Sequence, residues 1–336
     1  MLLTTLHTKI HQTIRTRNLF SKNQRLLIAV SGGQDSLCLV KILLDLQPKW
    51  AWDLGIAHCD HCWRSDSQAN AQHVEKIAKS WHLSFYLATT KQEIKTEANA
   101  RDWRYHELTL IAQTHNYDCV VTGHTASDRS ETLLYNLIRG SGMDGMQALA
   151  WQRPLNDTIC LVRPLLGISR STTEKFCQHL KLPIWEDSTN QDVKYARNRI
   201  RQELLPYLKT SFNPNIEFTL AQTAEILQAE VEYLQQTSKD LYQKVVFVSQ
   251  LSPTSWKIYR SQLQNTPMAL KRRVMRHVLQ KALLCSPNFE HIEKLTALIT
   301  APNHSQTDPF PGGAIAKVQG DWIYLVNSLG SLSTIE

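Results

Sequence analysis

Residues 26–46, LLIAVSGGQDSLCLVKILLDL, place two glycines between a short apolar run and a leucine-rich stretch with helical spacing. The run at 25–30 predicts a buried strand, and the stretch that begins near Asp35 predicts the helix after it. Gly32 and Gly33 allow backbone amides to crowd around an anion, and a helix start directs its positive end to the same point. The sequence therefore predicts an anion-binding loop at the carboxyl end of a strand.

Strand and helix patterns alternate through roughly the first 190 residues. Further strands are predicted at 53–58, 84–88, 118–123 and 158–166, and helices at about 67–82, 95–115, 127–139 and 169–180. This order predicts an α/β fold with an open, doubly wound, mostly parallel sheet. Ligands bind such sheets at the carboxyl ends of strands. The polar stretches at 31–36, 58–61 and 123–128 fall at these ends, so we expect them to form one site.

The rest of the chain has a different organisation. Apolar residues recur at three- and four-residue spacing after Asn215, which predicts a long helix. Pro206 and Asn213-Pro214 interrupt the pattern before it and predict a domain junction. We expect two domains: a nucleotide-binding catalytic domain at 1–208, and at 209–336 a helical linker followed by a smaller, helix-rich α/β domain that ends in a strand pair.

The formal net charge is +7, and its placement is uneven. No acidic residue stands between Asp240 and Glu290, whereas this stretch is rich in lysine and arginine. Basic patches of this kind attract the phosphates of nucleic acids. A solvated helix face is the alternative, because the same segment has helical apolar spacing. We predict a nucleic-acid contact for the four basic residues that cluster there, which are Lys271, Arg272, Arg273 and Arg276.

Composition narrows the class of protein. Hydrophobic residues make up 42% and charged residues 20% of the chain, as in ordinary globular proteins, and no apolar run reaches membrane-spanning length. The N-terminus predicts an amphipathic helix without a secretory cleavage pattern, so the expected location is cytoplasmic, with no membrane partner. The seven cysteines suggest no disulfide framework. Cys59 and Cys62 have metal-like spacing, but no second pair completes a site of about four ligands.

The loop itself is specific. The chain contains neither the GxxxxGK[ST] of a Walker loop nor the GxGxxG of a dinucleotide loop. Its SGGQDS resembles the loop of the ATP pyrophosphatases, which cleave ATP between the α- and β-phosphates. The resemblance implies an adenine-nucleotide α-hydrolase-like fold, ATP as cosubstrate and Asp35 as a ligand of Mg²⁺. The phosphate-binding residues that it implies are Ser31, Gly32, Gly33, Gln34, Asp35 and Ser36.

Five motifs between about residues 25 and 215 resemble the tRNA(Ile)-lysidine synthetases. Besides the loop, they are His58-Cys59-Asp60-His61 with Arg64; Glu97, Arg101, Arg104 and Tyr105; GHTASDRSETLLYNLIRGSG at 123–142; RPLL at 163–166; and WEDSTNQDVKYARNRIR at 185–201. The resemblance implies that ATP adenylates the wobble cytidine of a tRNA(Ile) with a CAU anticodon. Free L-lysine then displaces AMP to form lysidine.

The resemblance also implies residue roles. Adenosine recognition is expected of His58, Asp60 and His61. Asp128 and Glu131 are three residues apart and so share a helix face, with His124 one turn earlier; we expect these three to be catalytic with Asp35. One arginine of 197–201 is expected to face the substrate, and spacing does not select it. Our prediction assigns Arg197 to catalysis and three other arginines of these motifs to the tRNA, which are Arg101, Arg104 and Arg201.

The chain departs from the family pattern at three positions, and one of them, Cys62, keeps a rival open. Thr125 and Ser127 stand where the family often has other polar residues, and Cys62 replaces a frequent glycine. Cys62 completes one CxxC, so the alternative is a tRNA thiolase such as the 2-thiocytidine synthetases, which share the loop but need paired CxxC motifs for an iron–sulfur cluster. A further alternative is not an enzyme: a tRNA-binding protein that keeps the nucleotide-binding fold without activity. The oligomeric state is open, a homodimer included.

Overall fold

The computed structural model describes residues 4–63, 66–90, 94, 96–185, 193–249 and 255–326. The chain forms two compact units, residues 1–228 and 229–336, and the division falls within helix α10 (Ile216–Val245). In the described part of the chain, no helix combines the length and the apolar character that crossing a bilayer requires. Each unit has its own buried core, so the two are described in turn.

The first unit contains a six-stranded sheet in the order β3-β2-β1-β4-β6-β5. The first five strands of that order are parallel, and β5 pairs antiparallel with β6 at the edge. The strands are β1 (Arg25–Ala29), β2 (Asp53–Asp60), β3 (Ser84–Thr89), β4 (Cys119–Thr122), β5 (Gln152–Pro154) and β6 (Cys160–Val162). The strand order reverses direction between β1 and β4, which is where ligands bind in such sheets. The predicted doubly wound, mostly parallel fold is confirmed.

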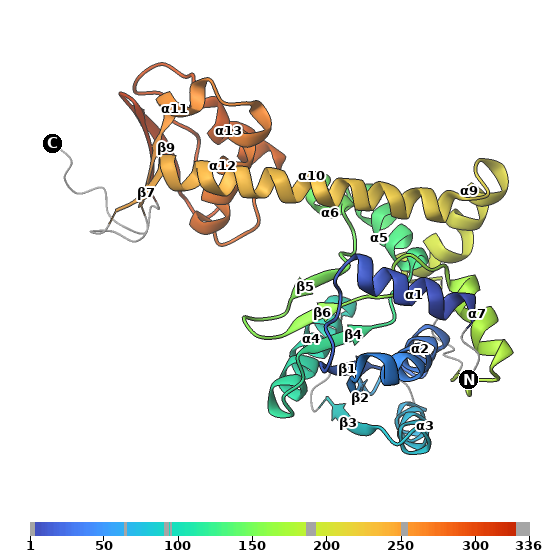
Figure 1. Ribbon diagram of the computed structural model, residues 1–336. Coiled ribbons are helices and arrows are strands. Elements are labelled where there is room, and N and C mark those ends of the chain that lie inside the picture. The colour runs from blue at the N-terminus through green and yellow to red at the C-terminus, as the bar shows by residue number, and fades with distance from the viewer. Residues whose placement is uncertain are drawn as a thin grey trace. The chain divides into compact units, whose positions relative to one another are not determined.

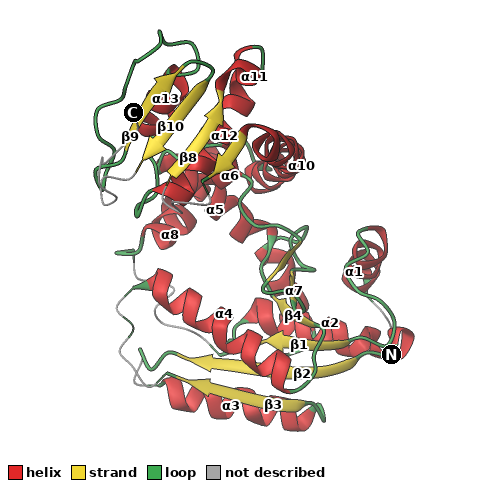
Figure 2. Cartoon of the chain, turned by 90° about the vertical axis from the view of Figure 1, so that its left-hand side faces the viewer, coloured by secondary structure: helices red, strands yellow, loops and turns green. Residues whose placement is uncertain are grey.

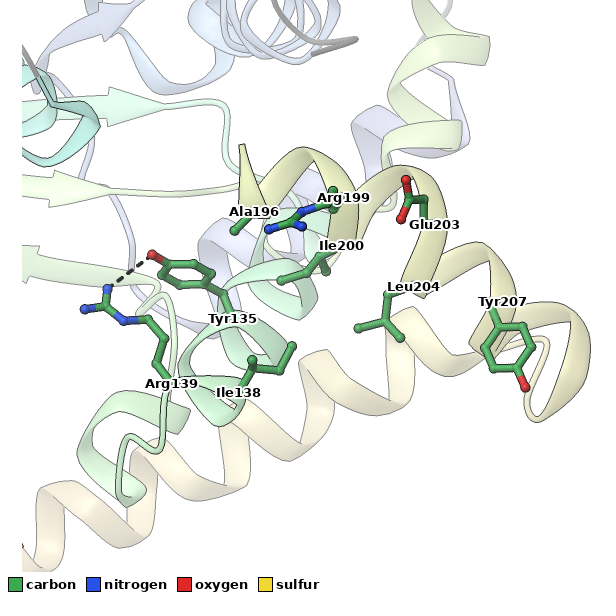
Figure 3. A pocket seen from close by; sticks show the side chains of 9 residues that line it. All are labelled: Tyr135, Ile138, Arg139, Ala196, Arg199, Ile200, Glu203, Leu204 and Tyr207. Atoms are coloured by element: carbon green, nitrogen blue, oxygen red, sulfur yellow. Dashed lines mark hydrogen bonds between the residues drawn. The ribbon is translucent and has the colours of Figure 1, made fainter. Parts of the chain in front are cut away.

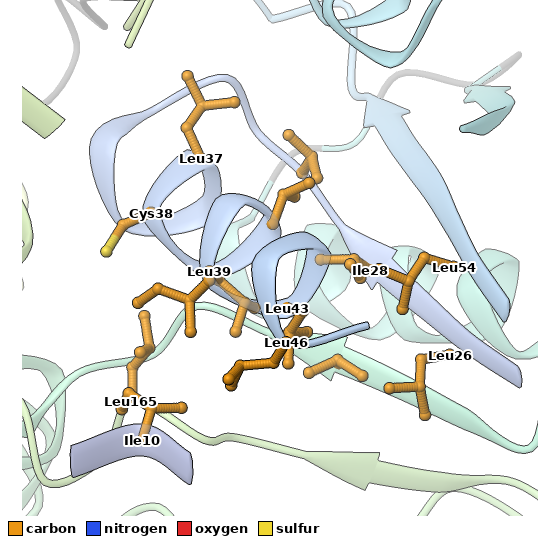
Figure 4. Packing of buried hydrophobic residues seen from close by; sticks show 14 of the residues in the cluster. Ile10, Leu26, Ile28, Leu37, Cys38, Leu39, Leu43, Leu46, Leu54 and Leu165 are labelled. Carbon is orange, nitrogen blue, oxygen red and sulfur yellow. The ribbon is translucent and has the colours of Figure 1, made fainter. Parts of the chain in front are cut away.

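Helices connect these strands and cover both faces of the sheet (Figure 1). They are α1 (Thr5–Thr16), α2 (Gln34–Trp50), α3 (Ser67–Ser80), α4 (Glu97–Thr114), α5 (Ala126–Ile138), α6 (Met143–Met146), α7 (Arg170–His179), α8 (Ala196–Arg199), the π-helical turn η2 (Ile200–Leu204) and α9 (Leu205–Ser211). Leu26 and Ile28 of β1 pack with α1, α2 and α7 in one core cluster, part of which Figure 4 shows. Leu27 between them packs with α4 in another. The two faces of the sheet are therefore both buried, as Figure 2 shows for α3 and α4 on either side of β1–β3.

One predicted strand differs from the structure. The sequence pattern predicted a strand at 158–166, but β6 ends at Val162 and is only three residues long. Arg163 is buried, and Pro164 has no amide hydrogen to donate to a ladder. The antiparallel edge strand β5 was not predicted. It pairs with β6 because the chain doubles back within residues 152–162.

The second unit packs three helices against an antiparallel sheet of order β7-β8-β10-β9. Its strands are β7 (Val246–Val248), β8 (Ser255–Tyr259), β9 (Ile315–Gln319) and β10 (Trp322–Val326), and its helices α11 (Arg260–Gln264), α12 (Met268–Ala282) and α13 (Phe289–Ala297). The strand pair β9–β10 agrees with the prediction, whereas β7 and β8 were not predicted; β7 has only three residues. Val274 and Val278 of α12 face this core, so the basic residues of the helix lie around its other faces.

Candidate active site

The loop after β1 is held in a conformation that requires glycine. Gly32 has φ +90°, and a Cβ at this position would lie 2.5 Å from Oδ1 of Asn70. Gly33 forms the N-cap of α2, and its amide donates to Oγ of Ser31 at 3.3 Å. The hydroxyl of Ser36 donates to the carbonyl of Gly33 at 2.8 Å. The first turn of α2 thus follows a tight glycine loop, an arrangement that presents backbone amides to an anion.

Two further strand ends lie beside this loop. A Cβ on Gly123, after β4, would lie 2.8 Å from the carbonyl oxygen of Asp35, so the two segments are in direct contact. The imidazole of His58, near the end of β2, is buried, and its Nδ1 lies 2.7 Å from the carbonyl oxygen of Val30. The structure therefore brings together the three predicted stretches, 31–36, 58–61 and 123–128.

Arg170, the first residue of α7, lies at the centre of the site. Its guanidinium donates to Asp35 at 3.2 Å, to Asp128 at 2.6 Å and to Glu131 at 2.9 Å. Arg201 of η2 adds a bidentate pair to Glu131, with both distances 2.8 Å. Three carboxylates thus face two guanidinium groups, and the group keeps a formal charge of −1. We refer to these five residues as the carboxylate–arginine cluster.

The cluster alters the pKa values of its carboxyl groups. Burial raises the pKa of Asp35, and the nearby charge of Asp128 acts in the same direction, while Arg170 opposes both. Burial also opposes ionisation of Asp128, but Arg170, His124 and hydrogen bonds from Thr125 outweigh it and lower the pKa of that carboxyl. Asp128 is therefore held as a carboxylate.

Asp128 is fixed in place by the start of its own helix. Thr125 is the N-cap of α5, and its backbone amide and its hydroxyl both donate to Oδ2 of Asp128 at 2.7 Å. This capping box leaves Oδ1 for Arg170. Ser127, at one of the departures from the family pattern, donates to Glu217 at 2.6 Å and accepts from the amide of Arg170 at 3.2 Å.

His124 adds a neutral polar group. Its Nδ1 lies 2.8 Å from the hydroxyl of Thr122. Burial, reinforced by the positive charge of Arg163, lowers its pKa to about 3. The imidazole is consequently uncharged near neutral pH and can accept or donate a hydrogen bond, but it supplies no positive charge.

The end of β2 forms an aromatic corner. The ring of His61 lies 4.9 Å from that of Trp103 and 5.5 Å from that of Trp63, and burial lowers its pKa to about 4. Asp60 accepts from the amide of Cys62 at 2.8 Å. Burial raises the pKa of Cys59 to about 12 and also raises that of Cys62.

Several buried polar atoms around the loop have no hydrogen-bond partner among the described residues. They are Nδ1 of His61, Oδ1 of Asn70 and Nε1 of Trp185. Buried polar groups are almost always satisfied, so these atoms are candidates for contacts with a ligand or an ordered water. Together with the glycine loop, they fit a nucleotide.

The arginines of the late motif separate in space. Arg201 contacts Glu131, whereas Arg197 donates to Glu97 at 3.2 Å and Arg199 lies elsewhere, in a pocket lining. In α4, Arg101 lies 3.8 Å from Asp102, and the guanidinium of Arg104 lies 5.7 Å from the ring of Tyr105. Arg64 and residues 186–192 lie outside the described part of the chain.

Sequence reasoning missed two residues of the site and gave a third, Arg163, no role. Arg170 is the most important, and a signal for it existed, because it stands at the start of the helix predicted after a strand. Thr173, one turn later, donates a hydrogen bond to Asp35. Arg163 of RPLL is buried and donates to the carbonyl of Ala150 at 2.7 Å.

The predicted basic patch lies in the second unit, on α12. Arg272 forms a bidentate pair with Glu293 of α13, at 2.6 and 2.9 Å. Lys271 donates to the carbonyl of Gln264 at 2.8 Å, and Arg273 and Arg276 are half-buried. The stretch without acids in the sequence is therefore partly neutralised in space by an acid from the next helix.

Comparisons with known proteins agree with this geometry. Residues 2–208 match the family model of the PP-loop domain, and residues 260–323 that of the TilS substrate binding domain. The tRNA(Ile)-lysidine synthase of Nostoc sp. is 65% identical, with 97% of this chain and 98% of the relative covered. The tRNA(Ile)-lysidine synthase of Synechocystis sp. is 49% identical, with 96% of this chain and 98% of the relative covered. The chloroplastic tRNA(Ile)-lysidine synthase of Zygnema circumcarinatum is 38% identical, with 89% of this chain and 81% of the relative covered.

A solved structure supports the fold alone. The U34-tRNA thiolase NcsA from Methanococcus maripaludis, with its [4Fe-4S] cluster, is similar with a TM-score of 0.57. It shares 14% sequence identity, and 66% of this chain and 78% of that chain are covered. The open α/β architecture around the glycine loop is thus found in another protein with very different sequence.

Proposed function

This chain belongs to the tRNA(Ile)-lysidine synthase family, an ATP-dependent ligase family with a PP-loop domain, and we propose that its reaction takes place at the carboxylate–arginine cluster. The observation that carries the proposal is the convergence of the glycine loop, Asp128 and Glu131 at the carboxyl ends of β1 and β4. The substrates that we propose are ATP, free L-lysine and the wobble cytidine of a tRNA(Ile) with a CAU anticodon.

The first step is adenylation of the base. The C2 oxygen of the cytidine attacks the α-phosphorus of ATP, and pyrophosphate leaves. We propose that the amides of the glycine loop and the hydroxyls of Ser31 and Ser36 hold the leaving pyrophosphate. The unpartnered atoms of His61, Asn70 and Trp185 provide contacts for the rest of the nucleotide.

Mg²⁺ is part of the proposal through Asp35. Among the described residues, no group of three or more His, Cys, Asp or Glu side chains is arranged to hold a metal ion. Mg²⁺ in nucleotide sites is usually bound by one or two carboxylates and by substrate phosphates, so Asp35 at the start of α2 fits this donor set. When bound there, the ion offsets charge on the phosphates.

The second step is displacement of AMP by lysine. The ε-amine of lysine must lose a proton to attack C2 of the cytidine, after which the C2–oxygen bond breaks and AMP leaves. We propose that the carboxylates of Asp128 and Glu131 hold the amino groups of lysine and draw the proton from the attacking amine. The capping box fixes Asp128 in position. The net negative charge of the cluster attracts the ammonium groups of lysine. Arg170 keeps the three carboxylates together.

The remaining assignments are proposals as well. Residues 1–208 are proposed to catalyse both steps in the cytoplasm, and residues 209–336 to bind the tRNA body through Lys271, Arg272, Arg273 and Arg276. Arg101, Arg104 and Arg201 are proposed to contact the anticodon arm, and Arg197 to act in catalysis. A homodimer stays an open expectation, which sedimentation of the purified protein would decide.

One experiment tests the function. The purified protein is incubated with unmodified tRNA(Ile) bearing CAU, ATP, Mg²⁺ and labelled lysine, and label is measured in the RNA. We expect ATP-dependent incorporation into this tRNA and none into a methionine tRNA. Absence of label would contradict the proposal. Replacing Cys59 and Cys62 by Ser should leave incorporation intact, and its loss in a folded protein would favour the thiolase alternative.

A further inference from the structure

A pocket of about 690 Å³ lies beside the second half of α5, within the first unit (Figure 3). Its volume is that of a typical small-ligand site. Neither the glycine loop nor Asp35, Asp128 or Glu131 contributes to its lining. The lining combines aromatic, aliphatic and basic side chains, and it consists of Tyr135, Ile138, Arg139, Ala196, Arg199, Ile200, Glu203, Leu204 and Tyr207.

The pocket is adjacent to the carboxylate–arginine cluster along α5. Glu131 and Tyr135 are four residues apart, and Arg139 follows four residues later, so the three share one helix face. At a rise of about 1.5 Å per residue, Tyr135 lies about 6 Å beyond Glu131 along the axis. One helix therefore carries a catalytic carboxylate at one level and the aromatic wall of the pocket at the next.

The opposite wall also connects the two places. The π-helical turn η2 supplies Arg201 to Glu131, and its neighbours Ile200 and Leu204 line the pocket. Single π-turns within helices are uncommon and frequently occur at functional sites. The same turn thus orients one side chain to the reaction site and others to the pocket.

The side chains suit an unstacked nucleobase. Arg139 donates to the hydroxyl of Tyr135 at 3.2 Å, as Figure 3 shows. The guanidinium groups of Arg139 and Arg197 lie over the ring of Tyr135, 5.3 and 5.7 Å from its centroid. Tyr207 is 58% exposed and contacts Phe212, which is 69% exposed, with ring centroids 5.7 Å apart. Proteins bind splayed-out RNA bases by stacking them on aromatic rings and guanidinium planes.

Charge selects the occupant. The lining contains two arginines, Arg139 and Arg199, and a single acid, Glu203. The excess positive charge repels lysine and attracts a phosphodiester. We propose that this pocket binds the nucleotide that follows the target cytidine in the RNA, with its base against Tyr207 and its phosphate at Arg199. This role presupposes the proposed function.

The test uses an anticodon stem-loop in which 2-aminopurine replaces the adenosine after the target cytidine. Stacking of 2-aminopurine on an aromatic ring quenches its fluorescence. We expect quenching on binding to the full-length wild-type protein, and its loss in the variants Tyr207→Ala and Arg199→Gln. In assays of lysine incorporation, each variant should raise the KM for the unlabelled stem-loop about tenfold, as expected for one lost base contact. Tyr207→Phe, which keeps the ring, should restore both readouts.

Matched controls come from exposed residues away from the pocket. Tyr233 is 71% exposed on α10, and Arg15 is exposed on α1, so Tyr233→Ala and Arg15→Gln should behave as wild type. Wild-type values of quenching and KM in both pocket variants would overturn the subsite. So would a change in oligomeric state without a change in RNA binding, since the pocket would then be an interface between copies.

The two proposals fail separately. If the wild-type protein incorporates no lysine, the proposed function is wrong, and the pocket is then judged by quenching alone. Quenching that depends on Tyr207 and Arg199 would still support a base-binding site, and quenching independent of them would overturn it.

Discussion

Arg170 and Arg272 both form short ion pairs, yet they lie in very different surroundings. Arg170 is 25% exposed and contacts three carboxylates from α2 and α5. Arg272 is 44% exposed and contacts one carboxylate, Glu293, which is 35% exposed. The distances are alike, with shortest contacts of 2.6 Å in both places. Distance alone therefore does not distinguish a reaction site from a surface contact.

The difference between the two regions lies in burial and in the number of partners. A buried charge that loses its partner is costly, whereas an exposed pair contributes little because water and salt screen it. In the cluster, removal of one arginine leaves three carboxylates facing each other. On α12, water can replace the lost contact. We therefore expect function and stability to depend on the cluster, and only long-range attraction of RNA to depend on α12.

The largest effect is expected from Asp35. Asp35→Ala removes the carboxylate that we propose for Mg²⁺ and should reduce tRNA-dependent pyrophosphate release by at least about 100-fold. Release is measured with purified protein, ATP and tRNA. Asp53→Ala is the control, because Asp53 is exposed and pairs with Arg25 outside the site. Unchanged release in Asp35→Ala would remove the loop from the mechanism.

The next prediction compares the two arginines directly. Arg170→Gln should lower the free energy of unfolding by about 3 kcal/mol, because it leaves buried carboxylates without their partner. It should also abolish most activity. Arg272→Gln should leave the melting temperature unchanged. Calorimetry measures the melting temperature of both variants. If the two substitutions lower it equally, the difference in burial does not explain how much each arginine contributes to stability.

A third prediction concerns pH. The pKa of His124 in the folded protein is about 3, below its usual value, so the unfolded chain takes up a proton first as the pH falls. The free energy of unfolding should thus decrease below pH 6.5, by at most about 1.4 kcal/mol per pH unit for this residue. The lowered pKa of Asp128 removes further stability at still lower pH.

His124→Asn should therefore flatten the dependence of unfolding on pH between 6.5 and 4. Burial also lowers the pKa of His277 on α12, with Lys281 and Lys239 acting in the same direction. His277→Asn should have a smaller effect, because that ring is only half-buried. His106→Asn, at an exposed position of α4, is the control. A pH slope that His124→Asn does not change would contradict the assignment.

The smallest effect is expected on α12. Changing Lys271, Arg272 and Arg276 to Gln should weaken tRNA binding and reduce the slope of log affinity against log salt. Each lost phosphate contact should reduce that slope by about 0.7 to 0.9, so the three substitutions reduce it by at most two or three times this amount. The reduction due to Arg272 should be smaller, because Arg272 already pairs with Glu293. ATP binding should not change. A wild-type salt slope would identify the patch as a solvated face.

Local patterns predicted much of the fold. The alternation of strands and helices in the first unit followed from apolar periodicity, because residues two or four positions apart already define which face is buried. The long helix α10 and the strand pair β9–β10 followed in the same way. Short elements failed: β5 and β7 have three residues each, too few for a periodic signal.

The candidate site was predictable where a residue's position follows from its own element. Gly32 was identified because two glycines stand between a strand pattern and a helix pattern, and its φ of +90° agrees with that prediction. Asp128 and Glu131 were identified because their three-residue spacing places them on one helix face. The choice among Arg197, Arg199 and Arg201 was not predictable. It depends on the π-helical turn η2, which shifts the register of the side chains that follow.

The sequence alone thus determined the glycine loop, the parallel sheet and the ends of strands at which polar residues gather, because each depends on neighbours within a few positions. Tertiary structure decided which charges meet. Asp35 and Arg170 are separated by 135 positions in the chain, and Arg272 and Glu293 by 21. Periodicity says which face of a helix is polar, but only packing brings a second helix against that face and supplies the partner that sets its charge.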